Sequence, residues 1–267
     1  MKNEGVYILE WLAFHRVIGF DEIFIYNNES TDTTAGLLAP LQAAGLVKVI
    51  PWPSVAGIAP QRAAYADVLS RTKCEWVCFI DADEFINLKC DDSIHAFLQR
   101  FPAAVSAIAM NWRLFGSSGR VAYEADLVTK RFNRSSRQSV HVNKHCKTIA
   151  RVEDIGEIHI HRCFLKSGLY VDESGEAIEI QRLGFTPGVR TNLVQINHYV
   201  LKSKEEFTWK QQRGNANRSS EEADKYLRLT REFFTAHDLN DEEDLSIHRF
   251  DARLEKELSF LRSLLHN

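Results

Sequence analysis

The chain has 267 residues, of which 45% are hydrophobic and 26% charged, a composition typical of a soluble globular protein with one large domain or a domain with an appendage. A net charge of −3 excludes the basic field that nucleic-acid binding requires, and the lack of a long apolar run or a signal-peptide pattern predicts a cytoplasmic protein with no transmembrane segment. Five cysteines without a CxxC pair indicate reduced thiols rather than a disulfide framework.

The first 112 residues alternate between helical and strand-like patterns. We expect helices over residues 8–17, 34–44, 60–72 and 92–101, and strands over 22–28, 46–52, 76–80 and 105–112. Gly19 and Gly45 follow the first two helices, Pro60 suits the first position of the third, and Asp92 or Ser93 can cap the fourth.

This alternation predicts an α/β fold, with a largely parallel sheet and helices on both faces. In such sheets, ligands bind outside the carboxyl ends of the strands. The polar loops NNESTD (27–32) and DADEF (81–85) follow two of the expected strands, so both are expected at the ligand-binding edge.

After residue 112 the pattern changes to a glycine-rich loop, LFGSSGR (114–120), followed by expected strands over 147–152, 156–163 and 194–200. Residues 201–267 are helical and charged, so we expect a main domain over 1–200 and a C-terminal helical extension packed on it. Ser203 with Glu206, and Ser219 with Glu222, have capping-box spacing. A leucine stripe in the last helix is expected to pack on the main domain, with a partner or membrane contact as the alternative: Leu254, Leu258, Leu261 and Leu265.

Asp81 and Asp83 form the only Asp-x-Asp motif in the chain and follow the apolar strand WVCFI. Alternate residues of an extended segment face the same side, so both carboxylates can bind one metal ion. Their oxygen ligands suit Mg²⁺ or Mn²⁺, which commonly complete their coordination with substrate phosphates. The alternative is a strand end whose acids are solvated or paired with arginines.

The glycine motifs of other nucleotide-binding classes are absent from the sequence. There is no GxGxxG after the first strand and no GxxxxGK[ST], which argues against a Rossmann dehydrogenase and a P-loop NTPase. A GxSxG motif is also absent, which argues against an esterase.

Two further groups of side chains could bind ligands. The segments HVNKHC (141–146) and HIHRC (159–163) hold zinc-capable residues in a spacing that matches no common zinc pattern; one of them, or His198, could instead add an imidazole to the Asp-x-Asp metal. Lys210 and Arg213 are three residues apart on a predicted helix and could offset a diphosphate's charge. A solvated face paired with Glu205 and Glu206 is the alternative.

Four ordered motifs resemble the glycosyltransferase family 2-like and family 92-like proteins. They are KNEGVYILEWLAFHRVIGFDEIFIYNNESTDTT, WVCFIDADEF, NWRLFGSSG and NHYVLKSKEEFTWKQQRG, and the resemblance spans about residues 2–214. It implies a GT-A fold, which is Rossmann-like with a mostly parallel sheet flanked by helices, here followed by the C-terminal helical extension. It also implies an enzyme that uses nucleotide-activated sugars.

The resemblance implies roles for particular residues. The nucleotide-sugar site is expected to contain Asn3, Glu4, Asn28, Ser30, Asp32, Asp81, Lys202, Lys210 and Arg213. Asp81, Asp83 and His198 are expected to hold Mn²⁺ or Mg²⁺, and Trp112, Gly116 and Ser117 to border the acceptor. In two respects the chain departs from these families. They usually begin with a strand before KNE, whereas this sequence starts at Met1-Lys2, so either that strand is missing or the start is misassigned. They also often carry an acid at the position of Asn27.

The expected reaction is transfer of a sugar, most simply a hexose, from a nucleotide donor of the UDP type to a hydroxyl of a saccharide or glycoconjugate, as in polysaccharide biosynthesis. Similar families invert the anomeric centre, which requires a general base. Asp126, at an expected helix start after the FGSSG loop, is the first candidate, and Glu124 is the second. Two rival hypotheses are a non-catalytic nucleotide- or glycan-binding protein on the same fold and a zinc-stabilised interaction module.

Overall fold

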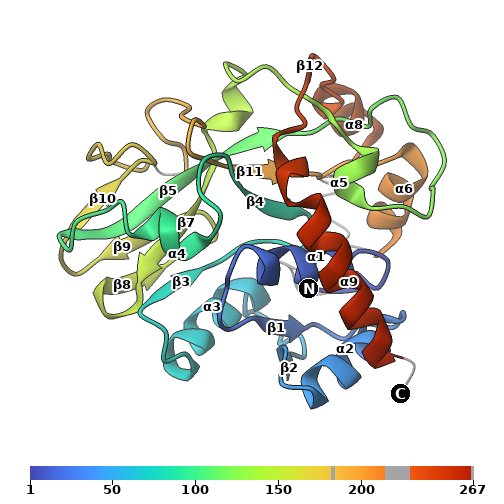
Figure 1. Cartoon of the computed structure of the whole chain (residues 1–267), viewed down its shortest axis with the longest axis horizontal. Coiled ribbons are helices and arrows are strands. Elements are labelled where there is room, and N and C mark those ends of the chain that lie inside the picture. Colours follow the sequence, from blue (N-terminus) through green and yellow to red (C-terminus); the bar gives the residue numbers. More distant parts are fainter. Residues whose placement is uncertain (182–183, 214–228, 266–267) are drawn as a thin grey trace.

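The computed structural model describes residues 1–181, 184–213 and 229–265. Its main sheet has six strands in the order β3-β7-β5-β11-β4, with β10 also paired to β5 (Figure 1). These strands are β3 (Trp76–Cys78), β4 (Glu84–Leu88), β5 (Val105–Leu114), β7 (Cys146–Arg151), β10 (Leu169–Val171) and β11 (Val194–His198). All ten residues of β5 are buried, so this strand forms the middle of the core.

The pairings in this sheet are mixed. β5 is parallel to β10 and β11, whereas β7 is antiparallel to β3 and β5, and β11 is antiparallel to β4. A separate pair, β1 (Phe24–Asn27) and β2 (Lys48–Pro51), is parallel. The α/β class with flanking helices is confirmed, but the main sheet is not mostly parallel. One reason is that β4 follows β3 after residues 79–83 alone, too few for a crossover helix.

The first three helices of the N-terminal half begin and end within one residue of their predicted bounds, whereas the fourth, expected over 92–101, is shorter and spans only Ile94–Leu98. They are α1 (Ile8–Val17), α2 (Thr34–Ala43), α3 (Pro60–Arg71) and α4 (Ile94–Leu98). Gly19 and Gly45 have φ values of +93° and +74°, the left-handed conformation that glycine adopts without steric strain. The Ser93 hydroxyl caps α4 by accepting a hydrogen bond of 3.2 Å from the Ala96 amide.

Two segments differ from the sequence-based expectation. Residues 84–88 form a strand, β4, so the acidic turn lies between two strands rather than in a long loop. The strand expected over 156–163 is instead a hairpin of β8 (Ile155–Ile158) and β9 (Cys163–Leu165). His159 and His161 therefore lie in the turn of a hairpin and do not share one face of a strand.

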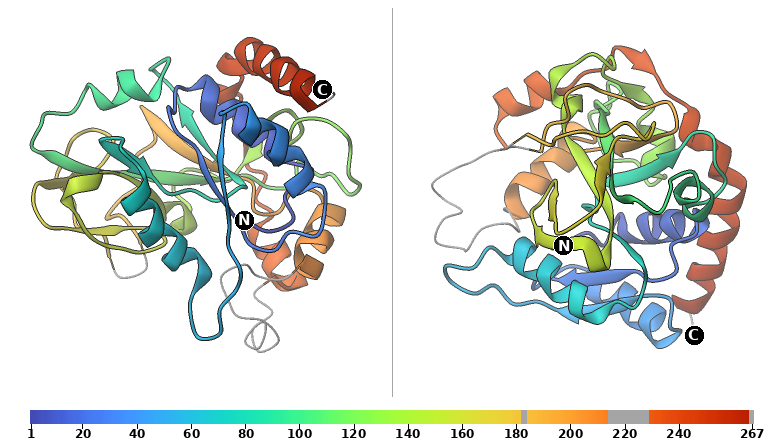
Figure 2. Two further views of the ribbon diagram at one scale, coloured as in Figure 1. Left: turned by 90° about the horizontal axis from the view of Figure 1, so that it is seen from below. Right: turned by 90° about the vertical axis from the view of Figure 1, so that its left-hand side faces the viewer.

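The C-terminal residues pack on the rest of the chain. Helix α9 (Asp251–Leu265) runs alongside α1 and reaches α2 (Figures 1 and 2), and Leu254, Leu258 and Leu261 are buried in the core, as expected. The remaining elements are α5 (Val128–Arg131), α6 (Lys204–Arg213), α8 (Arg231–His237), β6 (Arg134–Ser135), β12 (Glu242–Glu243) and the 3-10 turns His141–Lys144, Val152–Asp154 and Ser246–Phe250. The domain boundary at residue 200 stays a prediction.

The capping box at the start of α6 is confirmed. The Ser203 amide donates to Glu206 Oε2 over 3.1 Å, and the Glu206 amide donates to Ser203 Oγ over 3.2 Å. The second expected capping box, Ser219 with Glu222, lies outside the described residues.

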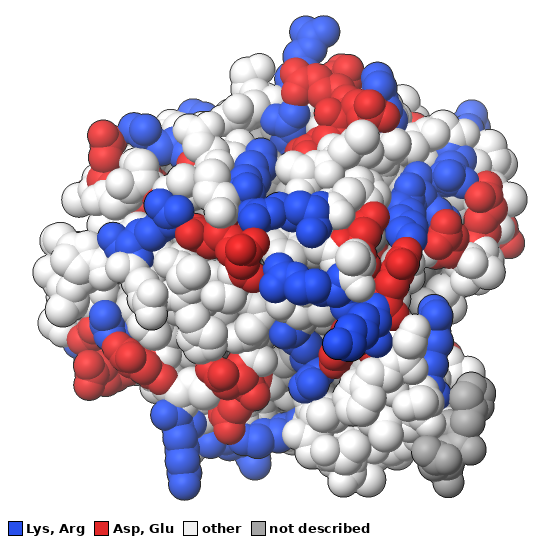
Figure 3. All heavy atoms as spheres, viewed as in Figure 1, with Lys and Arg blue, Asp and Glu red and all other residues white. Residues whose placement is uncertain are grey.

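Acidic and basic side chains are interspersed over the face shown in Figure 3. Ion pairs around α9 and the adjoining 3-10 turn include Arg16 with Glu257 at 2.6 Å, Lys130 with Glu255 at 2.6 Å and Arg249 with Asp92 at 2.7 Å. Within the described residues, no helix has the length and apolar character needed to cross a bilayer.

Candidate functional site

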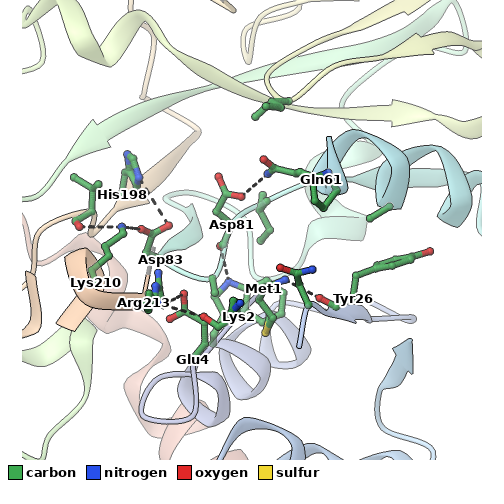
Figure 4. Close-up of a pocket in the computed structure, with 18 of the residues that line it drawn as sticks. Met1, Lys2, Glu4, Tyr26, Gln61, Asp81, Asp83, His198, Lys210 and Arg213 are labelled. Carbon is green, nitrogen blue, oxygen red and sulfur yellow. Dashed lines mark hydrogen bonds and ion pairs between the residues drawn. The ribbon is translucent and has the colours of Figure 1, made fainter. Parts of the chain in front are cut away.

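A pocket of about 450 Å³ is lined by residues of β1, α3, the β3–β4 turn, the end of β5, β11 and α6. This volume lies in the range of small-molecule and cofactor sites. Asp81, Asp83 and His198 all line it, together with Lys210 and Arg213 from α6 (Figure 4). The structure thus brings together the expected metal ligands and two of the expected cations.

Strand pairing and three hydrogen bonds fix the acidic turn. In the register of β11 with β4, His198 lies opposite Glu84, which places the imidazole beside the preceding Asp83. The Tyr199 amide donates to the Asp83 carbonyl over 2.8 Å. The Trp11 indole N–H donates to the carbonyls of Asp81 and Glu84 over 3.1 and 3.0 Å. The turn is therefore held on rigid elements, and its carboxylates face the pocket.

Both carboxylate oxygens of Asp81 have protein partners. The Gln61 amide donates to Oδ1 over 2.7 Å, and Lys147 Nζ lies 2.9 Å from Oδ2. Lys147 is fully buried on β7 and also lies 3.4 Å from Glu84 Oε2. Desolvation acts to raise the pKa of Asp81, but the Lys147 ammonium outweighs it and holds that pKa below its ordinary value.

Asp83 is buried and forms an ion pair with Lys210, whose ammonium also donates to the Val200 carbonyl over 3.0 Å. Desolvation acts to raise the pKa of Asp83, but Lys210 and Lys202 hold it well below its ordinary value. His198 Nε2 lies 3.9 Å from Asp83 Oδ1, and burial lowers the pKa of His198 to about 3. This imidazole is therefore neutral at physiological pH and able to act as a ligand.

The residues present fit Mn²⁺ or Mg²⁺ in chemical type. Two ligands of one ion, each at about 2.1 Å, can lie up to ~4.2 Å apart, and the 3.9 Å between His198 Nε2 and Asp83 Oδ1 falls within this limit. His198 Nδ1 has no hydrogen-bond partner among the described residues. In this arrangement, however, lysines engage both carboxylates, and no group of three or more potential ligand side chains in the described part of the chain is arranged to hold a metal.

The nucleotide-binding candidates near the N-terminus fall into two sets. Glu4 and Asn28 line the pocket, where Glu4 pairs with Arg213 and the Asn28 amide donates to the Trp52 carbonyl over 2.8 Å. The others lie outside the pocket lining and join two loops: Ser30 Oγ accepts from the Asn3 amide, and Asp32 Oδ2 accepts from the Gly5 amide, both over 2.9 Å.

Lys202, Gly116 and Ser117 also lie outside the pocket lining. The Lys202 ammonium lies 4.2 Å from the centre of the Tyr7 ring, and burial lowers its pKa to about 8. The Ser117 amide donates to Asp238 Oδ1 over 2.6 Å, and a side chain at Gly116 would collide with Asn240. The glycine-rich loop is thus held against residues 238–240.

The two candidate bases are exposed and have local partners. Glu124 Oε2 lies 2.5 Å from Arg120 Nη1, and Asp126 Oδ1 accepts a 2.7 Å hydrogen bond from the Leu127 amide beside the start of α5. Neither belongs to the described residues that line the pocket. Their catalytic role stays a prediction.

Sequence reasoning missed Gln61 and Lys147, which hold the Asp81 carboxylate. A glutamine on a helix and a lysine on a strand belong to no motif, so only the fold reveals them. Two histidines of the HVNKHC and HIHRC segments line the same pocket as the Asp-x-Asp motif, which one of the alternatives for these segments allowed. The ring centroids of His145 and His161 lie 4.7 and 5.4 Å from that of Trp112. With His198 at 4.2 Å, they make an aromatic wall on the acceptor side expected for Trp112.

Comparisons with known proteins agree with the motifs. The model of glycosyltransferase family 92 matches residues 2–228. A glycosyltransferase family 92 protein of Ricinus communis is 36% identical over 91 residues, 33% of this chain and 16% of the relative. One of Oryza sativa subsp. japonica is 29% identical over 125 residues, 45% of this chain and 21% of the relative. The matches thus span about a fifth of the relatives' length or less.

Two solved structures of S. aureus TarS are similar over 57% of this chain. For the first structure, the match covers 27% of the TarS chain, with 18% sequence identity and a TM-score of 0.35. For the second, TarS 1-349 in complex with UDP, the match covers 45% of the TarS chain, with 16% sequence identity and a TM-score of 0.33. The family match extends over most of the 267 residues, so the chain belongs to glycosyltransferase family 92, and the family expected from its motifs is confirmed.

Proposed function

We propose that the chain transfers a sugar from a nucleotide donor, UDP-linked, to a hydroxyl of a saccharide or glycoconjugate, with Mn²⁺ or Mg²⁺ held by Asp81, Asp83 and His198. The observation that carries this proposal is the meeting of these three side chains with Lys210 and Arg213 in one pocket. Carboxylates attract a divalent cation, whereas the cations of α6 attract a diphosphate.

The donor's parts are assigned by the chemistry of the pocket wall. Asn28, Tyr26 and Trp52 line one end, where aromatic faces and an amide suit a nucleobase. With the nucleobase at that end, Lys210 and Arg213 would contact the diphosphate, and Trp112 with its flanking histidines would border the acceptor. When bound, the ion supplies Lewis-acid stabilisation of the leaving diphosphate.

The chain's own residues orient the donor and stabilise charge. Lys147 and Gln61 fix the Asp81 carboxylate, so its direction is set before the donor arrives. Lys210 and Arg213 offset the negative charge that develops on the leaving group. For an inverting transfer, Asp126 and then Glu124 remain our candidates for the base, and a loop movement would have to bring either one to the acceptor hydroxyl.

Calorimetric titration of UDP tests the donor site. We expect UDP to bind wild type with Mn²⁺, and the affinity to fall at least ~10-fold with chelator or in Asp81→Asn. Asp92→Asn, which alters an exposed acid paired with Arg249, is the matched control and should bind as wild type does. UDP binding that is equal with and without metal and insensitive to Asp81→Asn would overturn the metal assignment.

Metal-dependent UDP binding without transfer or hydrolysis of any UDP-sugar would support the rival hypothesis, a nucleotide-binding protein on this fold. A screen of UDP-sugars with oligosaccharide acceptors distinguishes the two, because only an enzyme forms a new glycosidic bond. Turnover that disappears in Asp81→Asn but persists in Asp92→Asn would establish the enzyme.

A further inference from the structure

Each acid of the Asp-x-Asp motif has a lysine partner, but the two lysines differ in how exposed their side chains are. Lys147 has no exposed side-chain surface and contacts Asp81, Glu84 and the Ile160 carbonyl. Lys210 has 16% of its side chain exposed and lies in the second half of α6, facing the pocket. Of the two, Lys210 is therefore the lysine whose ammonium can leave its carboxylate and still reach solvent in the pocket.

We propose that Lys210 exchanges partners during donor binding: it neutralises Asp83 before the ligands bind, releases this carboxylate to the metal ion, and then pairs with the donor's diphosphate. This inference rests on the proposed function and adds to it a coupling between metal and donor. The Val200 carbonyl, 3.0 Å from the Lys210 ammonium, can remain its partner while the side chain turns.

The charges in the pocket explain why the movement of Lys210 from Asp83 to the diphosphate favours binding of both the metal ion and the donor. Arg213, three residues after Lys210, pairs with Glu4, so both pocket-lining cations of α6 are neutralised by acids. A metal ion arriving alone must displace the Lys210 ammonium from Asp83, and a diphosphate arriving alone must draw the same ammonium away from that carboxylate. Each ligand removes the obstacle to the other, so the two bind cooperatively.

Binding of Mn²⁺ to donor-free protein, followed by the electron paramagnetic resonance signal of the free ion, tests the exchange. In wild type, saturating UDP should tighten Mn²⁺ binding at least ~5-fold, the lower end of ordinary coupling between sites. In Lys210→Gln, donor-free Mn²⁺ binding should be ~10-fold tighter than in wild type, because no ammonium competes for Asp83. The effect of UDP on Mn²⁺ affinity should fall below ~3-fold in this variant.

Lys130→Gln is the matched control, because it neutralises a lysine whose acidic partner, Glu255, lies on the surface. It should keep the wild-type Mn²⁺ affinity and the wild-type coupling. If Lys210→Gln does not fold, Lys210→Met is the second neutral variant, and the coupling in wild type is measured whether or not either variant folds.

The outcomes separate this inference from the proposed function. Metal-dependent UDP binding in wild type together with unchanged donor-free Mn²⁺ affinity in Lys210→Gln would overturn the exchange and leave the donor site standing. The absence of any coupling in wild type would also overturn it. If wild type binds neither Mn²⁺ nor UDP, the proposed donor site fails, and the exchange fails with it.

Discussion

Two clusters of buried charge lie at the two halves of α6, and they differ in how completely their polar atoms are bonded. Glu206, in the first half, belongs to a cluster that we call the helix clasp: Tyr7, Glu10, Thr129, Arg131, Ser203 and Glu206. Lys210, one turn later, reaches the pocket cluster, in which every residue but the half-buried Asp81 is buried: Asp81, Asp83, Glu84, Lys147 and His198. One helix thus connects a cluster that stabilises the fold with one that we propose to bind ligands.

In the helix clasp, the charged groups have partners of good geometry. Both terminal nitrogens of Arg131 lie 2.8 Å from the Glu206 carboxylate, which also accepts from the Tyr7 hydroxyl over 3.0 Å. Glu10 accepts hydrogen bonds from the amides of Val128 and Thr129 over 2.6 and 3.0 Å. Such a network stabilises the packing of α1, α5 and α6, and its charged groups are engaged with one another.

In and around the pocket, several buried polar atoms have no hydrogen-bond partner within the described residues. These atoms are Glu4 Oε2, Gln61 Oε1, Glu84 Oε1, Trp112 Nε1, His161 Nδ1 and His198 Nδ1. Because unsatisfied buried groups are rare in folded proteins, their concentration here needs an explanation. The contrast teaches that burial of charge alone does not mark a site; unused bonding capacity facing a cavity does.

The largest effect on stability at a fixed pH is expected in the helix clasp. Glu206→Gln leaves the Arg131 guanidinium buried without a charged partner, so we expect the free energy of unfolding to fall by about 3–5 kcal/mol in urea titrations. Glu255→Gln, which breaks the more exposed pair with Lys130, should change it by less than ~1 kcal/mol. Equal effects of the two substitutions would show that the completeness of the clasp is unimportant.

The next effect depends on pH and concerns Glu84 in the pocket cluster. Burial raises the pKa of this side chain from an ordinary 4.5 to about 8. Between these values the folded state holds a proton that the unfolded state has lost, so this group's contribution to stability is present below pH 4.5 and lost as the pH rises through 8. The loss is roughly 5 kcal/mol, at about 1.4 kcal/mol per pKa unit.

Glu84→Gln should remove this pH dependence. Urea titrations from pH 4.5 to 9 should show the variant gaining stability relative to wild type as the pH rises, because the amide has no proton to lose. A constant difference between the two proteins over this range would contradict the raised pKa. Glu206→Gln is the control, because Glu206 has a pKa below its ordinary value and should not produce a slope in this window.

Much of the site could be predicted because strong local patterns encode it. An apolar strand that runs into Asp81 and Asp83 predicts carboxylates at a sheet edge, and the NHY motif added His198 through the family resemblance. The rest depends on long-range packing. Lys147 is 66 positions from Asp81, and nothing near either residue in the sequence predicts their contact.

The residues of the NNESTD loop show a second limit of prediction from the sequence. Serine and aspartate side chains in loops commonly bond to backbone amides. Ser30 and Asp32 do so across 27 positions of the chain, with Asn3 and Gly5. Residue type therefore cannot separate a structural loop from a ligand-binding one. Strand β4 was missed because Glu84 begins it directly after the acids, with no glycine or proline to indicate a turn.

The smallest change in stability is expected where the proposed function is most sensitive. Asp83→Asn keeps the side chain's size and a carbonyl acceptor, and the freed Lys210 ammonium faces the pocket, where water can solvate it. We therefore expect the free energy of unfolding to stay within ~1 kcal/mol of wild type, while metal-dependent UDP binding weakens at least ~10-fold. Urea titration and calorimetry on the same preparation measure both.

If Asp83→Asn instead lost as much stability as Glu206→Gln, the ion pair between Asp83 and Lys210 would be structural like the helix clasp. Lys210 would then not be free to change partners, because a ligand would have to overcome the same free energy that holds Asp83 and Lys210 together.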